Sequence, residues 1–406
     1  MIEELTKACV HCGFCLPTCP TYVLWNEEMD SPRGRIQLME KTATGTLRLS
    51  PTVVEHFDRC LGCMACVSSC PSGVQYDRLI EEQRHVVERE HERTRAERLQ
   101  RQLLFATLPY PRRLRWALRL APLGRALPAP AWARPMLELA PRWRSTERPA
   151  PVTPACVEST QAPPRVGLLT GCVQSVCFGD VNAATARVLA AAGYEVVAPA
   201  QGCCGALSAH AGRAEESARF TERLAKSFAG LESIVVNASG CGSHLKDHGL
   251  PALDVTEALH RAELRGAELR GAELRDLAPL ELKVAYQDSC HLRHAQRLPA
   301  AWRSVLERIP GLTVVEPAEQ DLCCGSAGIY NVVQPEAARE LGDRKARHVL
   351  ATGADVYASA NPGCLVQVSQ ALHRAGRPLP ALHPVELLDA SLRGTSATEL
   401  VASARR

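Results

Sequence analysis

Two cysteine runs with the same spacing constrain this chain more than any other feature. Residues 9–20 read CVHCGFCLPTCP and residues 60–71 read CLGCMACVSSCP, so both follow C-x2-C-x2-C-x3-C-P. This spacing binds [4Fe–4S] clusters: three thiolates hold one cube, and in two-cluster proteins the fourth ligates the other cube. The spacing therefore predicts two clusters with crossed ligands, one on Cys9, Cys12, Cys15 and Cys70 and the other on Cys60, Cys63, Cys66 and Cys19.

A structural zinc ion is the alternative reading of these runs. A pair of C-x2-C units could hold zinc through four thiolates. Zinc needs neither the third C-x2 step, nor the final C-P, nor the complete run twice. We therefore predict iron–sulfur clusters. Because the coordination of both clusters would be complete, they form a path for electrons, and we predict no catalytic residue in the chain.

The remaining composition excludes several other classes of protein. Eighteen cysteines would indicate disulfides in a short secreted chain, but this chain has 406 residues, and MIEELTKACVHCG at its start has no apolar signal segment. No stretch approaches the roughly 18 apolar residues of a membrane-spanning helix. A formal net charge of +3 argues against general nucleic-acid binding. We therefore expect a cytoplasmic protein with reduced cysteines.

A basic segment rich in tryptophan follows the cysteine runs. Residues 77–104 have helical periodicity, and residues 101–144 contain nine arginines, a single acidic residue and three of the five tryptophans. Prolines divide the segment into short helices. Arginine with tryptophan on short amphipathic helices is typical of membrane-surface anchors and of protein docking surfaces, whereas a plain linker is the alternative. Residues 145–164 are predicted to be a linker.

From residue 165 the pattern changes to alternating strands and helices. Strands are predicted at residues 165–170, 194–199 and 233–239, and again at 283–289, 312–317 and 355–360. Helices are predicted at residues 182–193, ending at Gly193, and at residues 300–311. Strand, helix, strand at these lengths implies parallel α/β units.

The cysteines repeat along with these units. Each half has a single cysteine, a vicinal pair and a second single cysteine, at similar intervals, which indicates an internal duplication. The first set is Cys172, Cys203, Cys204 and Cys241, and the second is Cys290, Cys323, Cys324 and Cys364. The single cysteines follow predicted strands, and the carboxyl ends of parallel strands are where such sheets bind ligands. We expect each set to converge.

These patterns divide the chain into five parts. They are a two-cluster ferredoxin-like domain at residues 1–104, a basic docking segment and linker at 105–164, two cysteine-rich domains at 165–260 and 277–406, and an AELRG repeat linker at 261–276. The predicted fold class is a helical cluster domain followed by two tandem α/β domains.

On these residues the chain resembles the iron–sulfur subunit of bacterial glycolate oxidase (glycolate dehydrogenase). The matching segments are the two cysteine runs, SPRGR at residues 31–35 between them, and the two C-C-G halves that follow. The same order occurs in iron–sulfur subunits of anaerobic glycerol-3-phosphate dehydrogenase and of lactate utilisation, and in a subunit of heterodisulfide reductase. These families are the alternatives to glycolate oxidase.

The resemblance implies an electron-transfer subunit of an oxidoreductase complex. FAD-containing partner subunits would oxidise glycolate to glyoxylate, and the clusters would pass the electrons to a quinone or another acceptor at the membrane. The protein is then expected at the cytoplasmic face of the inner membrane. No G-x-G-x-x-G and no P-loop motif occurs in this chain, so FAD is expected only in the partners.

The C-C-G halves depart from the heterodisulfide reductase pattern, which ends in C-x-x-C and binds an unusual iron–sulfur cluster. Here the last positions are His244 in CGSH and Gln367 in CLVQ, which argues against an autonomous disulfide reductase. Each set of four cysteines could still hold a further metal centre, with His244 as an extra ligand in the first and His291 adjacent in the second. The alternative is reduced cysteine packed as a small apolar side chain, as expected for Cys156 and Cys177.

Overall fold

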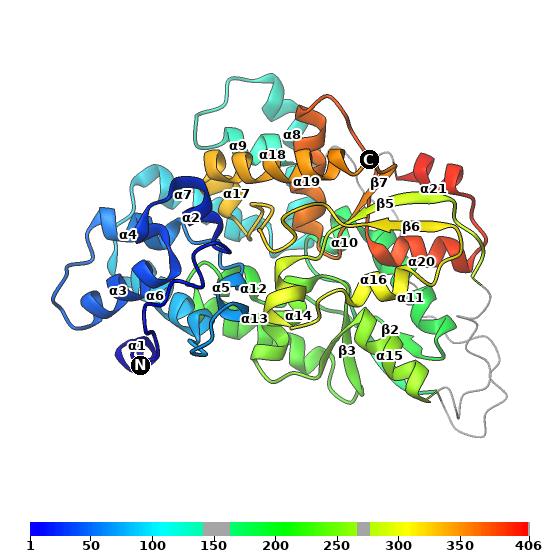
Figure 1. The fold of residues 1–406 in the computed structure, drawn as a ribbon, viewed down its shortest axis with the longest axis horizontal. Helices are drawn as coiled ribbons and strands as arrows, with labels where there is room; N and C mark the ends of the chain where they lie inside the picture. Colours follow the sequence, from blue (N-terminus) through cyan, green and yellow to red (C-terminus); the bar gives the residue numbers. More distant parts are fainter. Residues whose placement is uncertain (141–162, 266–276, 405–406) are drawn as a thin grey trace.

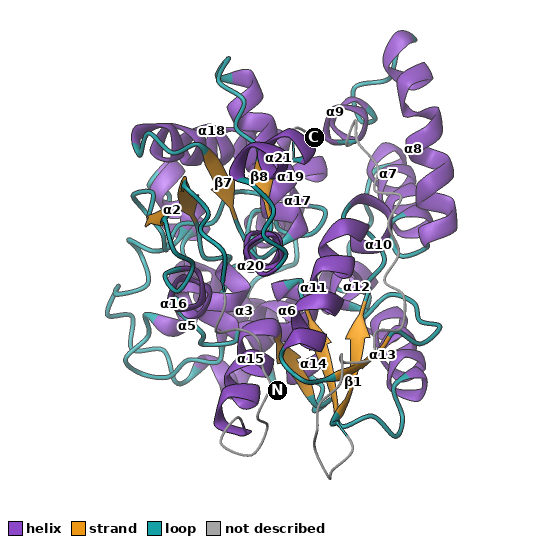
Figure 2. Ribbon diagram, turned by 90° about the vertical axis from the view of Figure 1, so that its right-hand side faces the viewer, coloured by secondary structure: helices purple, strands orange, loops and turns teal. Residues whose placement is uncertain are grey.

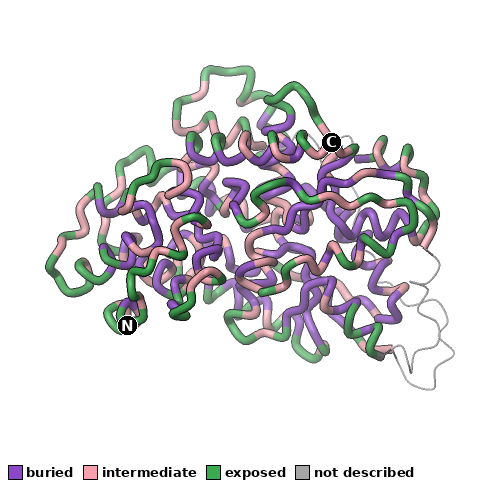
Figure 3. The backbone as a smooth tube through the Cα atoms, in the orientation of Figure 1, coloured by how far each residue is buried: buried purple, intermediate pink, exposed green. Residues whose placement is uncertain are grey.

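The computed structural model describes residues 1–140, 163–265 and 277–404. The N-terminal helices lie at one end of the molecule and the C-terminal helices at the other, as the blue and red ends of the ribbon show (Figure 1). Buried segments run through the middle of the molecule, whereas exposed backbone lies mainly at the periphery (Figure 3). The predicted linker at residues 145–164 and most of the AELRG repeat lie outside the described residues.

The cluster unit consists of short helices that begin at prolines. Its elements are α1 (Ile2–Thr6), α2 (Pro20–Trp25), the 3₁₀ turn η1 (Glu28–Asp30), α3 (Pro32–Ala43), α4 (Pro51–Asp58), α5 (Ala65–Ser68) and α6 (Tyr76–Glu90). Proline at the first helical position lacks only an N–H that would have no intrahelical partner, so it begins these helices without cost. Pro20 thus starts α2 directly after the first cysteine run. Met39, Phe57, Leu79 and Ile80 form the core of this unit.

The basic segment folds as three helices, as its prolines predicted. They are α7 (Arg95–Thr107), α8 (Pro111–Ala126) and α9 (Arg134–Leu139). A capping box of Thr94 and Glu97 starts α7. Helix α7 runs across residue 104, where the first predicted domain boundary lies, and α15 (Val255–Arg265) runs across the one at residue 260. The division into domains otherwise stays a prediction.

Two parallel four-stranded sheets form the lobes that follow (Figure 2). The first has β1 (Arg165–Leu169), β2 (Glu195–Val197), β3 (Ser233–Val236) and β4 (Ala252–Asp254) in the order β2-β1-β3-β4. The second has β5 (Leu282–Tyr286), β6 (Leu312–Val315), β7 (Val356–Ala358) and β8 (Ala381–Leu382) in the equivalent order β6-β5-β7-β8. The predicted duplication is therefore present in the topology.

The helices of each lobe follow the same plan. The first lobe has α10 (Gln174–Cys177), α11 (Gly179–Ala191), α12 (Ala206–Ala209), α13 (Ala214–Ser227) and α14 (Ser239–Asp247). The second has the π-helical turn η2 (His291–Ala295), α16 (Ala301–Leu306), α17 (Tyr330–Val333), α18 (Pro335–Ala351), α19 (Pro362–Arg374), α20 (Pro384–Leu392) and α21 (Ala397–Ser403). Gly193 has a φ of 87° just beyond α11, which confirms the predicted helix end.

The two lobes share one hydrophobic core. Val181 and Leu189 of α11 belong to the same buried cluster as Trp302, Tyr357 and Leu387 of the second lobe. Arg187 on α11 forms a two-pronged ion pair with Asp389 on α20, with Nε–Oδ1 and Nη2–Oδ2 distances of 2.8 and 2.7 Å. The second lobe is thereby fixed to the first through its last helices.

The cluster unit packs against both lobes. Arg84 of α6 donates to the carbonyl of His210 in the first lobe (2.9 Å). Ser68 of α5 is hydrogen-bonded to His294 in the second lobe (2.7 Å between Oγ and Nδ1). The cluster unit is therefore docked on both lobes, with the second cysteine run buried at the junction.

Candidate iron–sulfur sites

The first site joins cysteines of the two runs in one pocket. Cys9, Cys12 and Cys15 line it together with Cys70, as the crossed-ligand prediction expects, and Cys66 lies at its wall. Apolar neighbours such as Val10 and Ile36 complete the lining. Cys12 is exposed, so this site is open to solvent on one side.

The second site gathers Cys19 with the cysteines of the other run. Burial raises the pKa of the Cys66 thiol well above its ordinary value, and the thiols of Cys63, Cys60, Cys19 and, least, Cys15 of the first set raise it further. Cys60 and Cys66 also belong to one buried cluster. Cys19, Cys60, Cys63 and Cys66 are all buried, in contrast to the first set.

Both runs fold in the same way because the same positions adopt left-handed backbone. His11 and Gly62 follow the first cysteine of each run by two residues, with φ of 54° and 63°. Gly13 and Met64 follow the second cysteine by one residue, with φ of 86° and 63°. Such turns aim main-chain N–H groups inward, and the Gly62 N–H lies 3.4 Å from Cys60 Sγ. At this position the main-chain amide thus approaches a cysteine sulfur.

Cationic groups surround the second site. Burial alone would raise the pKa of Cys60, but the guanidinium groups of Arg35 and Arg84 lower it below its ordinary value. The hydroxyl of Tyr76 also lies 3.6 Å from Cys60 Sγ. None of these three residues was predicted as a site residue. SPRGR, which contains Arg35, was the available signal, but it was used only as a segment that carries the family resemblance.

The thiols suit clusters better than single ions. In the part of the chain that the structure describes, no three His, Cys, Asp or Glu side chains meet closely enough to hold one metal ion. A zinc ion needs four ligands at about 2.0–2.3 Å from one point, whereas a [4Fe–4S] cube is ligated at four separate iron corners. Cysteines spread around a pocket, as here, fit the cube.

Each lobe also brings its four cysteines together at the carboxyl ends of its strands. In the first lobe, Cys172 Sγ lies 3.6 Å from Cys203 Sγ, and Cys204 contacts both Cys203 and Cys241. In the second lobe the distance between the sulfurs of Cys290 and Cys323 is 4.0 Å, and Cys324 contacts Cys323 and Cys364. Each set follows three adjacent parallel strands, where the topology places ligand sites.

The residues at the missing cysteine positions face neighbouring helices. His244 Nε2 lies 3.0 Å from the Thr221 hydroxyl on α13, and burial lowers its pKa to about 3, so the ring is neutral. Gln367 on α19 donates to the carbonyl of Ala338 on α18 (2.7 Å). The two side chains therefore act as equivalent helix-to-helix links. His244, predicted as an extra ligand, thus lies at the main chain of Cys204, to whose carbonyl Thr221 also donates (3.0 Å), with its Nε2 next to the Thr221 hydroxyl.

His291 lies beside the second set. Its Nδ1 is 3.6 Å from Cys290 Sγ, and its Nε2 is buried without a hydrogen-bond partner. The ring makes an edge-on contact with His210 of the first lobe, with centroids 5.0 Å apart. Burial lowers the pKa of His291 to about 4. The ring is thus a neutral group at the junction of the two lobes.

The second set lies directly against the second cluster site. Leu61, Cys63 and Ala65 pack with Cys323 and Tyr330 in one buried group that Cys290 also contacts. Cys204 of the first lobe belongs to a different buried group, with Leu169 and Leu245, against which Cys241 also packs. The duplicated lobes are therefore not equivalent in their relation to the cluster unit.

Two family models match the chain at these sites. The 4Fe-4S dicluster domain matches residues 5–74, and the cysteine-rich domain matches residues 166–246 and 284–369. The probable glycolate oxidase iron-sulfur subunit of Bacillus subtilis is 34% identical over 94% of this chain and 92% of its own length. The glycolate oxidase iron-sulfur subunit of Escherichia coli is 34% identical over 96% of this chain and 95% of its own length.

The chain belongs to the family of glycolate oxidase iron–sulfur subunits. A lactate utilization protein A of Oceanobacillus iheyensis is 27% identical but matches only 57% of this chain.

This membership confirms the prediction of iron–sulfur clusters and the fold of a ferredoxin-type unit followed by two cysteine-rich domains. It places the chain in a family of oxidoreductase subunits. Within the described ranges, no helix combines the length and apolar character needed to cross a bilayer.

Proposed function

We propose that this chain is the electron-transfer subunit of a glycolate dehydrogenase. FAD-containing partner subunits remove two electrons from glycolate to give glyoxylate, and this chain passes the electrons on, one at a time, to a quinone. Bound [4Fe–4S] clusters supply the one-electron redox steps. The observation that carries the proposal is the crossed grouping of Cys9, Cys12, Cys15 and Cys70 against the buried group around Cys66, in a chain of this family.

The contribution of the chain itself is to hold the clusters apart from water and close to one another. Cys66 lies both at the wall of the first pocket and among the thiols of the second site, so the two clusters would be close neighbours. Burial of the second site keeps solvent away from it. A short path with a dry interior favours transfer between the clusters over loss of electrons to dissolved oxidants.

The test is made on the complex purified anaerobically through a tag on this chain. Glycolate, lactate and glycerol 3-phosphate are added to separate samples, and low-temperature EPR spectra are recorded. A reduced [4Fe–4S] signal with glycolate alone is expected. A signal only with one of the other substrates would move the chain to a sister function. No signal with any of them, from clusters that dithionite reduces, would reject the relay and favour a disulfide reductase.

The proposal includes a surface that brings the chain to the membrane. Helix α8 buries Leu114 and Leu118 in the core, while the opposite face exposes Trp116, Leu120 and Leu123, each about three-fifths accessible. Residues 98–137 contain eight arginines and no acidic residue. The Arg119 guanidinium lies over the Trp116 ring, 4.8 Å from its centroid. An apolar face ringed by arginines complements an anionic lipid bilayer, which is also where a quinone resides.

Vesicle sedimentation of the purified complex tests this surface. We expect binding to phosphatidylglycerol-containing vesicles and little binding to neutral ones. The double substitution Leu120→Glu/Leu123→Glu should reduce the bound fraction several-fold, because two charges would enter the lipid. Leu264→Glu is the matched control, since Leu264 is equally exposed on α15 outside this face. Unchanged vesicle binding with loss of the flavoprotein would assign the face to the partner subunit instead.

We further propose a third metal centre on Cys290, Cys323, Cys324 and Cys364. Three features support this set over the one in the first lobe. Its Cys323 and Cys290 pack with Cys63 of the second cluster site, it lies beside His291, whose other ring nitrogen has no hydrogen-bond partner, and all but Cys290 are buried. Cys172, Cys203, Cys204 and Cys241 remain a candidate set of the same kind.

A further inference from the structure

The SPRGR segment at residues 31–35 has a role that the cysteine ligands do not explain. Ser31 caps α3 by accepting the Gly34 N–H (3.0 Å), and Pro32 is the first helical residue. Gly34 has no room for a side chain, because an added Cβ would lie 1.9 Å from the Glu28 carbonyl oxygen. These three residues together fix the start of α3 tightly against η1. The result is that Arg35 points into the interior.

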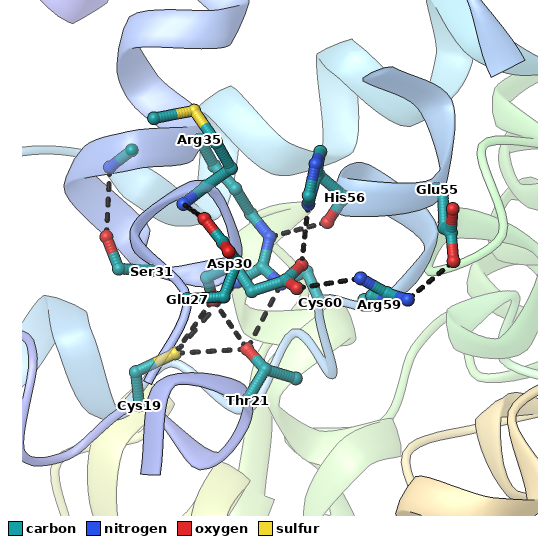
Figure 4. A network of polar contacts seen from close by, with 12 residues as sticks. Cys19, Thr21, Glu27, Asp30, Ser31, Arg35, Glu55, His56, Arg59 and Cys60 are labelled. Carbon is teal, nitrogen blue, oxygen red and sulfur yellow. Dashed lines mark hydrogen bonds and ion pairs between the residues drawn. The ribbon is translucent and has the colours of Figure 1, made fainter. Parts of the chain in front are cut away.

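Arg35 is fully buried and held by four groups (Figure 4). Its Nε donates to the His56 carbonyl (2.6 Å), and its Nη2 donates to Thr21 Oγ1 (3.1 Å) and Asp30 Oδ1 (3.2 Å). Its Nη1 lies 3.9 Å from Cys19 Sγ. Burying a guanidinium group costs free energy unless it is hydrogen-bonded in this way. Much of the surrounding region therefore serves to hold this side chain.

The charge of Arg35 is only partly balanced by buried groups. Asp30 is also fully buried, and it is shared: its carboxylate accepts from Arg59 Nη1 (2.9 Å) as well as from Arg35. Arg59 is also paired with Glu55 (2.5 Å), but that carboxylate is half-exposed, so Asp30 is the one buried carboxylate that faces the two guanidinium groups. Arg84 adds a further cation, because it hydrogen-bonds the Cys60 carbonyl.

Arg33, two residues earlier, is different in each respect. It lies near the first site, where its Nη1 donates to the His11 carbonyl (3.2 Å). Its own carboxylate partner, Glu28, binds it with both oxygens (2.6 and 3.0 Å), so the pair is neutral. Its side chain is about three-tenths exposed, and water screens what charge remains. One motif thus places a partly exposed, fully paired arginine at the first site and a buried arginine that shares its carboxylate at the second.

We propose that Arg35 is a positioning residue that raises the reduction potential of the cluster on Cys19, Cys60, Cys63 and Cys66 above that of the cluster on Cys9, Cys12, Cys15 and Cys70. Reduction adds one negative charge to a cluster, and a fixed cation in a dry site stabilises that charge. Electrons then move from the solvent-facing cluster to the interior one. The inference rests on the proposed function, because it assumes that both clusters are bound.

Redox titration of the purified complex, followed by EPR, tests the inference. Arg35→Gln should shift the midpoint of the interior cluster to lower potential and leave the other cluster almost unchanged. Arg33→Gln is the matched control within the same motif, and it should leave the interior cluster where it was. Arg35→Lys keeps the charge and should retain most of the wild-type midpoint.

Asp30→Asn should shift the midpoint potential of the interior cluster in the opposite direction, which makes it the decisive variant. It removes the only carboxylate of the buried group, so the midpoint of the interior cluster should rise. Damage to the fold would move Arg35→Gln and Asp30→Asn in the same direction, and that result would overturn the inference, as would an unchanged midpoint in Arg35→Gln. If Arg35→Gln loses its clusters, the midpoint potentials of Asp30→Asn and Arg35→Lys test the inference instead. A raised midpoint in the first and a nearly unchanged midpoint in the second are then the expected results. Absence of two dithionite-reducible clusters from the unmodified complex would instead reject the proposed function.

Discussion

Substitution of Cys63 is the most direct way to interrupt the proposed electron transfer. It belongs to the interior cluster site and also packs against Cys323 of the second lobe. We expect Cys63→Ala to leave the partner flavin reducible by glycolate while transfer to a quinone analogue falls at least tenfold, because the interior cluster loses a ligand. Stopped-flow absorbance separates the two steps.

Cys177→Ala is the control for this prediction. Cys177 is equally buried but lies in the common core, outside both cysteine runs and both lobe sets. Its loss should lower stability and leave transfer intact. Unimpaired transfer in Cys63→Ala, with iron content reduced, would show that electrons do not need the interior cluster.

The roles of some single residues could be predicted from the sequence, whereas those of others could not. The eight cysteines of the two runs were predicted as ligands from spacing alone, because cluster geometry dictates that spacing. Arg35 could not, since its role depends on burial by η1, α4 and the Cys19 loop, which are distant in sequence. His244 shows the reverse case: a metal-ligand residue type in a ligand position, whose Nε2 bonds to Thr221 instead.

At the scale of elements, α6 carries a titratable group at the junction with the first lobe. Burial and the nearby carboxylates of Asp247 and Asp77 raise the pKa of Glu81 to about 7, against the smaller opposing effects of Arg84 and His248. The folded state therefore binds this proton more tightly than the unfolded state. Its stabilising contribution is complete below about pH 4.5 and is lost as the pH rises through about 7.

Glu81→Gln removes this dependence. Above pH 7.5 it should raise the free energy of unfolding by about 1–3 kcal/mol, less than the full shift implies because the side chain is only half-buried. Near pH 5 the gain should be small. Melting temperatures between pH 5 and 9 measure this, with Glu90→Gln at the exposed end of the same helix as control. Equal gains at both pH values would mean that Glu81 is not protonated in the folded protein.

The elements themselves were predicted where the pattern was long enough. Six strands were placed correctly, whereas β4 and β8 were missed because neither contains the valine that all the other strands have. The helix predicted to reach residue 311 ends at Leu306, because Pro310 cannot continue it. The helices of the basic segment were predicted from its prolines, but which face of α8 is buried depends on the core contacts of Leu114 and Leu118.

At the scale of the whole molecule, the two lobes have the same topology but pack differently against the cluster unit. Repetition of the cysteine order predicted two equivalent lobes, and the strand orders agree. The sequence could not predict that only one cysteine set would share a buried group with the interior cluster site, because that depends on how the cluster unit docks. Equal chemistry in the two lobes would therefore not mean equal function.

This asymmetry predicts different effects of the same substitution in the two lobes. Cys323→Ala and Cys203→Ala each remove the first cysteine of a vicinal pair. If the second set of cysteines holds a third redox centre on the electron-transfer path, Cys323→Ala should lower the rate of quinone-analogue reduction at least tenfold. Both ferredoxin-type clusters should still be reducible by glycolate. Cys203→Ala should change that rate less than threefold, because Cys204 and Cys241 of its set pack in a separate buried group, away from the interior cluster site.

Iron content and EPR of the two variants make the comparison decisive. Loss of iron only in Cys323→Ala, together with the slower rate, would locate a metal centre in the second lobe and on the path. Equal loss of rate in both variants would mean that the lobes act as one unit through their common core. Full activity of Cys323→Ala would mean that the electron-transfer path within this chain ends at the interior cluster. The four cysteines of each lobe would then be packing residues at the ends of their strands.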